Sequence, residues 1–100
     1  MTIIKDSEGH EATVLNAMAN FQNHRVLEIG CGDGRVTWRL ADNAAFVMAL
    51  DPNADDIEKA KGNTPERSRE KVSFLPSTLE DFVASYTGAK FNSAIFSWSL

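Results

Sequence analysis

The chain has 100 residues, of which 43% are hydrophobic and 24% are charged, a composition typical of one small globular domain. Its formal net charge of -4 and pI near 5.0 argue against phosphate binding by counterion release, so we expect no nucleic-acid partner. The longest apolar run, Ala44 to Leu50, is far shorter than the roughly 20 residues that span a bilayer, and the apolar stretch at the N-terminus is too short for a secretory signal. We therefore expect a soluble, cytoplasmic protein that does not bind membranes.

Helix-like and strand-like stretches alternate along the chain. The first is a helix over residues 8–22, where Ser7 can form the N-terminal cap and apolar residues recur at spacings of three and four. The stretches that follow are strands at 25–29, 45–50, 72–75 and 91–96, and helices that begin at Arg35, Ala54 and Leu79. Because such alternation is typical of parallel strands joined by right-handed crossovers, we predict an α/β fold in a single domain over residues 1–100. Its parallel sheet should have about four strands with helices on both faces.

The most informative stretch is Val26 to Gly34, an apolar strand followed by a glycine at every second position. Gly30, Gly32 and Gly34 permit backbone angles that a side chain would forbid, and they let a ligand approach the main chain closely. The helix that follows at once presents free N–H groups and a partial positive charge at the same place. A crevice of this kind, at the carboxyl end of a strand, is where open α/β sheets bind nucleotides.

An acidic residue at the end of the second predicted strand supports a nucleotide site. Asp51 falls 21 residues after Gly30, where a carboxylate can accept hydrogen bonds from both hydroxyls of a ribose. The alternative is that Asp51 caps the next helix. The dinucleotide-binding fingerprint needs glycine or alanine where this chain has Arg35, which disfavours a nicotinamide-dependent oxidoreductase.

The cysteine and histidine content predicts neither a disulfide nor a metal site. Cys31 is the only cysteine, so no internal disulfide can form. His10 and His24 lie far from it in the sequence, so we expect no metal ligand cluster. We interpret Cys31 as a small residue that fits a tight loop rather than as a reactive thiol.

The pattern G-x-G-x-G, with Glu28 two residues before it, resembles the first motif of the class I, seven-stranded S-adenosylmethionine-dependent methyltransferases. Val26 to Gly34 is similar to the family's usual V-L-E-I-G-C-G-x-G, and the likeness extends over nearly the whole chain. The resemblance implies a Rossmann-like sheet with strand order 3-2-1-4, a cofactor-binding core over residues 25–100, and S-adenosyl-L-methionine as the cofactor. A complete fold of the family has further strands, so the chain is similar to its N-terminal part only.

Later stretches are similar to further motifs of the family. The end of the second strand looks like the second motif, in which Asp51 would hold the ribose and Pro52 would border the adenine. The stretch after the third strand looks like the third motif, with Thr78 where aspartate is common and the Leu79 N–H at the adenine edge. The fourth strand looks like the fourth motif and would place Ser97 at the rim of the cofactor crevice. The cofactor-binding residues that the resemblance implies are Glu28, Gly30, Cys31, Gly32, Gly34, Asp51, Pro52, Thr78, Leu79 and Ser97.

Several of these residues also have a purely structural interpretation. Glu28 can be a buried acid whose hydrogen bonds are satisfied by loop amides. Thr78 and Leu79 can be only the start of a helix, because Ser77 to Glu80 has the form of a capping box. We interpret Trp38 as a packing residue.

The resemblance implies transfer of a methyl group to an unidentified small-molecule acceptor, mainly by holding two reactants in attack geometry, and it identifies no catalytic residue. An alternative is a non-catalytic nucleotide-binding or interaction fragment of the same fold. Because the chain stops just after its fourth predicted strand, Phe91 to Phe96, we expect that strand to form an exposed edge. The chain alone is then expected to be unstable, to self-associate through that edge, or to need a partner that supplies the missing half.

Overall fold

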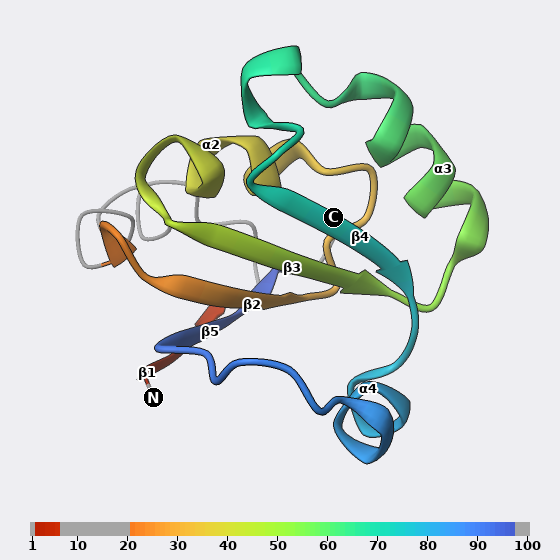
Figure 1. Cartoon of the computed structure of the whole chain (residues 1–100). Coiled ribbons are helices and arrows are strands. Elements are labelled where there is room, and N and C mark those ends of the chain that lie inside the picture. Colours follow the sequence, from red (N-terminus) through yellow and green to blue (C-terminus); the bar gives the residue numbers. More distant parts are fainter. Residues whose placement is uncertain (1, 7–20, 98–100) are drawn as a thin grey trace.

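The computed structural model describes the backbone of residues 2–6 and all atoms of residues 21–97 (Figure 1). The elements in chain order are β1 (Thr2–Asp6), β2 (Arg25–Ile29), α2 (Arg35–Asn43), β3 (Phe46–Asp51), α3 (Ala54–Asn63), the 3-10 turn η2 (Glu66–Ser68), β4 (Val72–Pro76), α4 (Leu79–Ser85) and β5 (Ser93–Ser97). The predicted helix over residues 8–22 falls almost wholly on residues 7–20, which lie outside the described residues.

The described strands form one parallel sheet in the order β1-β5-β2-β3-β4. The four strands that the sequence predicts keep the predicted order 3-2-1-4, which is confirmed. The additional strand β1 pairs with β5, with Thr2 opposite Ser93 and Asp6 opposite Ser97. The sheet therefore has five strands rather than about four in the described part of the chain.

The expectation of an exposed edge at Phe91 to Phe96 is wrong. The strand in this region, β5, lies between β1 and β2, and four of its five residues are buried. The sequence argument failed because it did not assign a strand to the short segment Thr2–Asp6, which supplies the missing backbone partner. Because β5 has strand partners on both sides, we no longer expect self-association through it.

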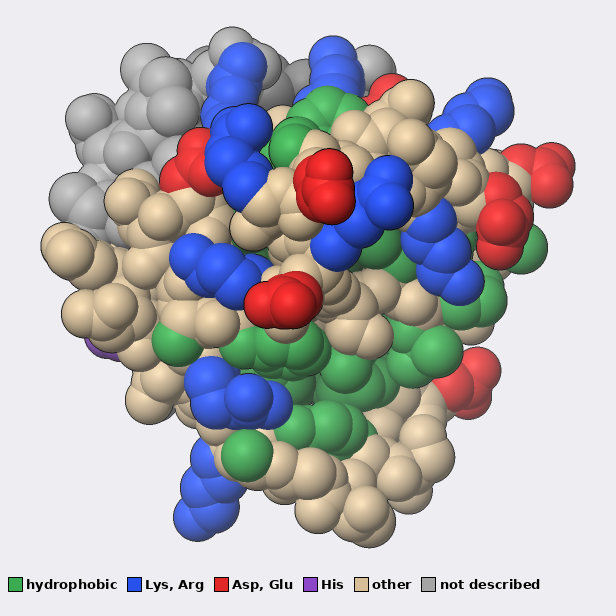
Figure 2. Space-filling view, turned by 45° about the horizontal axis from the view of Figure 1, so that its top comes forward, with side chains coloured by type: hydrophobic (Ala, Val, Ile, Leu, Met, Phe, Trp, Pro, Cys, Tyr) green, Lys and Arg blue, Asp and Glu red, His purple; other side chains and the backbone are tan. Residues whose placement is uncertain are grey.

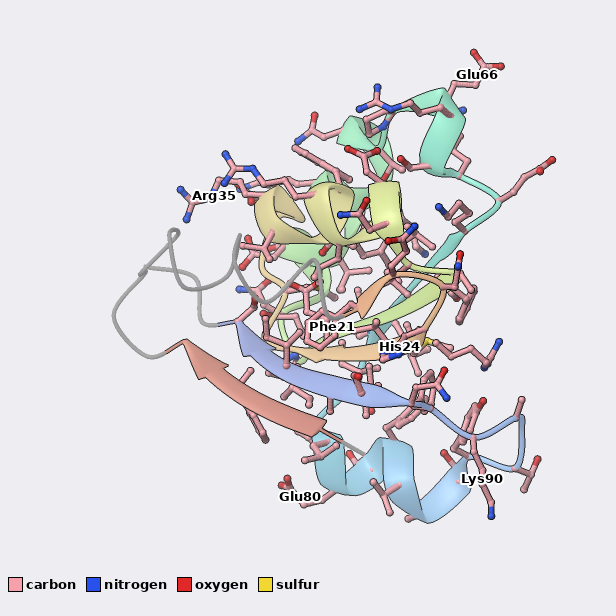
Figure 3. All side chains as sticks on the ribbon, turned by 90° about the vertical axis from the view of Figure 1, so that its left-hand side faces the viewer. Phe21, His24, Arg35, Glu66, Glu80 and Lys90 are labelled. Carbon is pink, nitrogen blue, oxygen red and sulfur yellow. The ribbon has the colours of Figure 1, made fainter. Side chains whose placement is uncertain are left out.

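Two apolar clusters hold helices against the two faces of the sheet (Figure 3). On one face, Val26, Val47 and Ile95 are buried together with residues of α2 and α3. On the other face, Leu27 and Leu50 pack against α4. The members of the first cluster also include Phe21, the last apolar residue of the predicted N-terminal helix. Helices on both faces, as predicted, leave the carboxyl ends of β2, β3, β4 and β5 at one common edge.

Candidate cofactor-binding site

A pocket of about 400 Å³ lies at that common edge, between the carboxyl ends of β2, β3 and β5 and the start of α4. Its lining residues are Ile29, Gly30, Asp51, Pro52, Ser77, Thr78, Leu79, Glu80 and Phe96. The structure thus brings together five of the residues that the sequence implies, from three segments far apart in the chain. Those five are Gly30, Asp51, Pro52, Thr78 and Leu79.

Four lining residues were missed by the sequence argument, and each is adjacent in sequence to a residue that was named. Ile29 precedes Gly30, Phe96 precedes Ser97, and Ser77 and Glu80 flank Thr78 and Leu79. The two apolar side chains were taken only as parts of strands. They form walls of the pocket because a strand that ends at a binding edge exposes its last residues there.

The glycine turn closes tightly over the end of β3. The N–H groups of Gly30 and Cys31 both donate to the Leu50 carbonyl, at 2.8 and 2.9 Å. Gly30 and Gly32 have φ values of 80° and 55°, in the left-handed region that residues with a Cβ rarely adopt. The loop can therefore lie against β3 and keep its main chain at the pocket.

The Asp51 carboxylate ties this turn to the next one. Its Oδ2 accepts a hydrogen bond from the Gly32 N–H at 3.0 Å, and its Oδ1 accepts one from the Asn53 N–H at 2.9 Å. The alternative that Asp51 caps the following helix is wrong, because Asn53 caps α3 by accepting from the N–H groups of Asp55 and Asp56. A carboxylate oxygen can accept more than one hydrogen bond, so Asp51 can also bind donors in the pocket that it lines.

Glu28 does not line the pocket. It is completely buried and lies two residues before Gly30, the first glycine of the turn. The Thr37 hydroxyl on α2 donates to its Oε1, so loop amides do not satisfy this acid. Burial raises the pKa of Glu28 from its ordinary 4.5 to about 7; the hydroxyls of Thr37 and Ser97 lower that pKa in part, and the Asp51 charge raises it. Its Oε2 has no hydrogen-bond partner among the described residues.

Ser97 is the second buried polar group beside the turn without a partner. Its side chain is 5% exposed, it does not line the pocket, and its Oγ makes no hydrogen bond within the described part of the chain. Glu28 is two residues after Val26 and Ser97 is two residues after Ile95, so both lie on the sheet face that α2 covers. The Ser97 hydroxyl thus lies near enough to Glu28 to lower its pKa, but neither Ser97 Oγ nor Glu28 Oε2 completes a well-formed hydrogen bond with a described residue.

Cys31, Gly32 and Gly34 belong to the turn but not to the pocket lining. The Cys31 thiol is buried, and burial raises its pKa well above the ordinary range, as a structural cysteine requires. At Gly34, φ is 93°, and an added Cβ would approach Trp38 and the Ala60 side chain to 3.3 Å. Gly34 is thus needed for the close packing of α2 on α3.

Thr78 is both a pocket residue and a helix cap. Its Oγ1 accepts a hydrogen bond from the Asp81 N–H at 3.1 Å, so Thr78 rather than Ser77 caps α4, which begins at Leu79 as predicted. The pocket wall here combines this hydroxyl with the apolar side chain of Leu79.

The electrostatics of the pocket favour some ligands over others. Its lining contains the carboxylates of Asp51 and Glu80 and no lysine, arginine or histidine. Without a cation, such a pocket is poorly suited to a pyrophosphate and suits a neutral or positively charged nucleoside. Among residues 2–6 and 21–97, no three histidine, cysteine or acidic side chains are placed to bind a metal ion. No helix in the same ranges has the length and hydropathy needed to cross a bilayer.

A parallel sheet with a glycine turn after one strand and an acid at the end of the next is a Rossmann-like α/β architecture. A family model described as a methyltransferase domain matches residues 20–100. The chain therefore belongs to the methyltransferase domain family, in agreement with the class I methyltransferase resemblance of its motifs.

Curated relatives are longer than this chain. A magnesium-protoporphyrin O-methyltransferase of Rhodobacter capsulatus is 40% identical over 57 residues, which cover 57% of this chain and 25% of that protein. A ubiquinone biosynthesis O-methyltransferase of Vibrio campbellii is 33% identical over 64 residues, which cover 64% of this chain and 27% of that protein. The chain thus spans about a quarter of the length of these relatives.

Solved structures share the fold. The YcgJ protein from Bacillus subtilis aligns with a TM-score of 0.73 and 21% identity over 87% of this chain and 38% of its own. A putative methyltransferase from Streptococcus mutans, solved in complex with SAH, aligns with a TM-score of 0.72 and 17% identity over 86% of this chain and 49% of its own. At these identities the likeness establishes the Rossmann-like architecture alone.

Proposed function

We propose that this chain is the cofactor-binding part of an S-adenosylmethionine-dependent methyltransferase and that the pocket beside Asp51 holds the cofactor. The observation that carries the proposal is the position of the Asp51 carboxylate, which lines the pocket and accepts a hydrogen bond from the glycine turn. Family membership supports the same chemistry. The bound cofactor would supply an electrophilic methyl group on a sulfonium.

The residues present fit this cofactor. The carboxylates of the lining and the absence of a lining cation suit a nucleoside that carries positive charge. Asp51 would accept hydrogen bonds from the ribose, while Pro52, Thr78 and Leu79 would surround the adenine. Glu28, Ser97 and the turn at Gly30, Cys31, Gly32 and Gly34 would hold the amino-acid end, either directly or by shaping the loop; the orphaned Glu28 Oε2 and Ser97 Oγ support this part of the proposal.

We propose a small molecule as the methyl acceptor. The net charge of -4 disfavours a nucleic acid, and the named relatives of Rhodobacter and Vibrio are O-methyltransferases of magnesium-protoporphyrin and of ubiquinone biosynthesis. The acceptor atom is not assigned, and a cytoplasmic location stays a prediction. A non-catalytic nucleotide-binding role of the same fold is the second candidate.

Calorimetric titration with S-adenosylhomocysteine tests the cofactor site. The chain should bind this product, and Asp51→Asn should weaken binding at least about tenfold through loss of a charge-assisted acceptor. Asp42→Asn is the matched control, because Asp42 lies outside the pocket and pairs with Arg67 on the surface. Circular dichroism verifies that each variant is folded. Absence of binding by the folded chain, or equal affinities of Asp51→Asn and the parent, would refute the assignment.

A further inference from the structure

The last strand of the described sheet, β4, carries backbone groups that no other strand uses. The Val47 N–H donates to the Lys71 carbonyl, and the Ser77 N–H donates to the Asp51 carbonyl. Because residues of a strand alternate in the side toward which their N–H and C=O groups point, Val72 and Phe74 direct both groups away from β3. No strand among the described residues pairs with this edge.

A hollow lies on the α3 side of this edge. It has a volume of about 670 Å³ and is lined by the half-buried side chains of Val72 and Phe74, by Thr64, and by Lys61 and Arg69 at its rim, among others. In Figure 1 β4 is the outermost strand on its side of the sheet, and Figure 2 shows hydrophobic side chains among Lys and Arg side chains on the face toward the viewer. Leu75, on the opposite side of the strand, is 39% exposed.

The two ends of β4 carry opposite charge. Arg69 and Lys71 flank Glu70 just before the strand, which leaves an excess of positive charge there. Glu80 and Asp81 follow the strand at the start of α4, and both are exposed. In an antiparallel pair of two β4 strands, the acidic end of each strand lies near the basic end of the other. Opposite charges therefore meet at both ends of the pair.

We propose that two copies of this chain associate through an antiparallel pairing of their β4 strands. In the register that places Val72 opposite Phe74 of the second copy, each such pair exchanges both N–H···O bonds. Every outward N–H of β4 is then satisfied, and Pro76, which has no N–H, is not required. The two-fold axis passes through Ser73, so that Ser73 lies opposite its own copy.

Side-chain packing agrees with the same register. A two-fold axis perpendicular to the sheet keeps the α3 sides of both copies on one face, so Val72 packs beside Phe74 of the second copy at the hollow. On the other face, Lys71 lies opposite Leu75 of the second copy, and its aliphatic part covers the exposed leucine. The edge of β4, which has no strand partner within the described chain, is thus paired with β4 of the second copy.

Introduction of a charge of either sign at Ser73 tests this pairing by sedimentation velocity over a series of protein concentrations. The parent chain should dimerise, whereas Ser73→Lys and Ser73→Glu should each raise the dimer dissociation constant about tenfold, because like charges oppose each other across the axis. An equimolar mixture of the two variants should recover the association. The controls are Ala84→Lys and Ala84→Glu, on the exposed side of α4, which should leave the dissociation constant unchanged.

Each alternative result refutes the proposal. A parent chain that stays monomeric at every concentration excludes the dimer, and a dimer that both Ser73 variants leave intact must use another surface. A mixture that stays dissociated, with both variants folded by circular dichroism, contradicts the two-fold register. Cofactor binding is measured separately, so failure of this dimer leaves the cofactor proposal standing.

Discussion

Replacement of Glu28 by glutamine should remove a pH dependence of stability that this buried acid creates. Burial raises the pKa of Glu28 in the folded chain to about 7, above its ordinary value of 4.5. Between these two pH values the unfolded chain releases the proton and the folded chain retains it. The folded chain then binds more protons, so the free energy of unfolding falls as pH rises through this window.

The magnitude follows from the gap between the two pKa values. Each pH unit is worth about 1.36 kcal/mol, so the gap from 4.5 to about 7 corresponds to a loss of about 3 kcal/mol between pH 4 and pH 8. Glu28→Gln keeps the shape and the acceptor for the Thr37 hydroxyl but does not ionise. The variant should therefore lie within about 1 kcal/mol of the parent at pH 4 and be more stable by about 3 kcal/mol at pH 8.

Urea unfolding followed by circular dichroism at a series of pH values measures this difference. The relevant quantity is the difference between parent and variant, because all other titrating groups are common to both proteins. Glu58→Gln is the control, since Glu58 is exposed on α3 and should leave the pH dependence unchanged. Parallel curves for the parent and Glu28→Gln would show that Glu28 ionises normally in the folded chain and would overturn the reasoning.

Substitutions at Gly34 and Thr78, each with a matched comparison, test the local structure of the site by urea unfolding. Gly34→Ala should lower the free energy of unfolding by about 1–3 kcal/mol, because φ is 93° and the new Cβ would press on Trp38 and Ala60. At Gly62, within α3, an added Cβ would have no atom within 4 Å, so Gly62→Ala should raise the free energy of unfolding by about 0.5–1 kcal/mol. Changes of the same sign in Gly34→Ala and Gly62→Ala would contradict this prediction. Thr78→Ala should cost about 1 kcal/mol through loss of the cap on Asp81 N–H, and Thr78→Ser should restore most of it; equal losses would exclude the cap.

The parallel strands were predictable because their signals are local, whereas their order 3-2-1-4 was implied by the resemblance to the family. Apolar runs of strand length, the glycines from Gly30 to Gly34 and the spacing to Asp51 all lie within short windows of sequence. The position of Asp51 at the pocket followed from this spacing, because the carboxyl ends of parallel neighbours meet at one edge. The resemblance to methyltransferase motifs then added the adenine-side residues Thr78 and Leu79, which line the same pocket.

Other features depend on contacts that no local pattern encodes. The pairing of Thr2–Asp6 with β5 joins segments at opposite ends of the chain, and a five-residue strand has too few residues to establish a period. The partner of Glu28 is Thr37, one element further on, rather than an amide of the adjacent loop. Ser77 and Thr78 are both good caps by residue type, but in the structure Thr78 caps α4 and the Ser77 hydroxyl donates to the Thr78 carbonyl.

The buried acid is the feature that links the energetics of the fold to the proposed site. At neutral pH Glu28 costs the folded chain stability, and its Oε2 makes no hydrogen bond with any described residue. A neutral side chain of the same shape would fill this position without that cost, so packing alone does not account for an acid here. Local rules of stability are broken where function requires it, and Glu28 lies directly before the turn that Asp51 ties to the pocket. We therefore expect Glu28 to contribute to ligand binding at the glycine turn. Two results together would support this role: Glu28→Gln is more stable than the parent at neutral pH, and its affinity for S-adenosylhomocysteine differs from that of the parent.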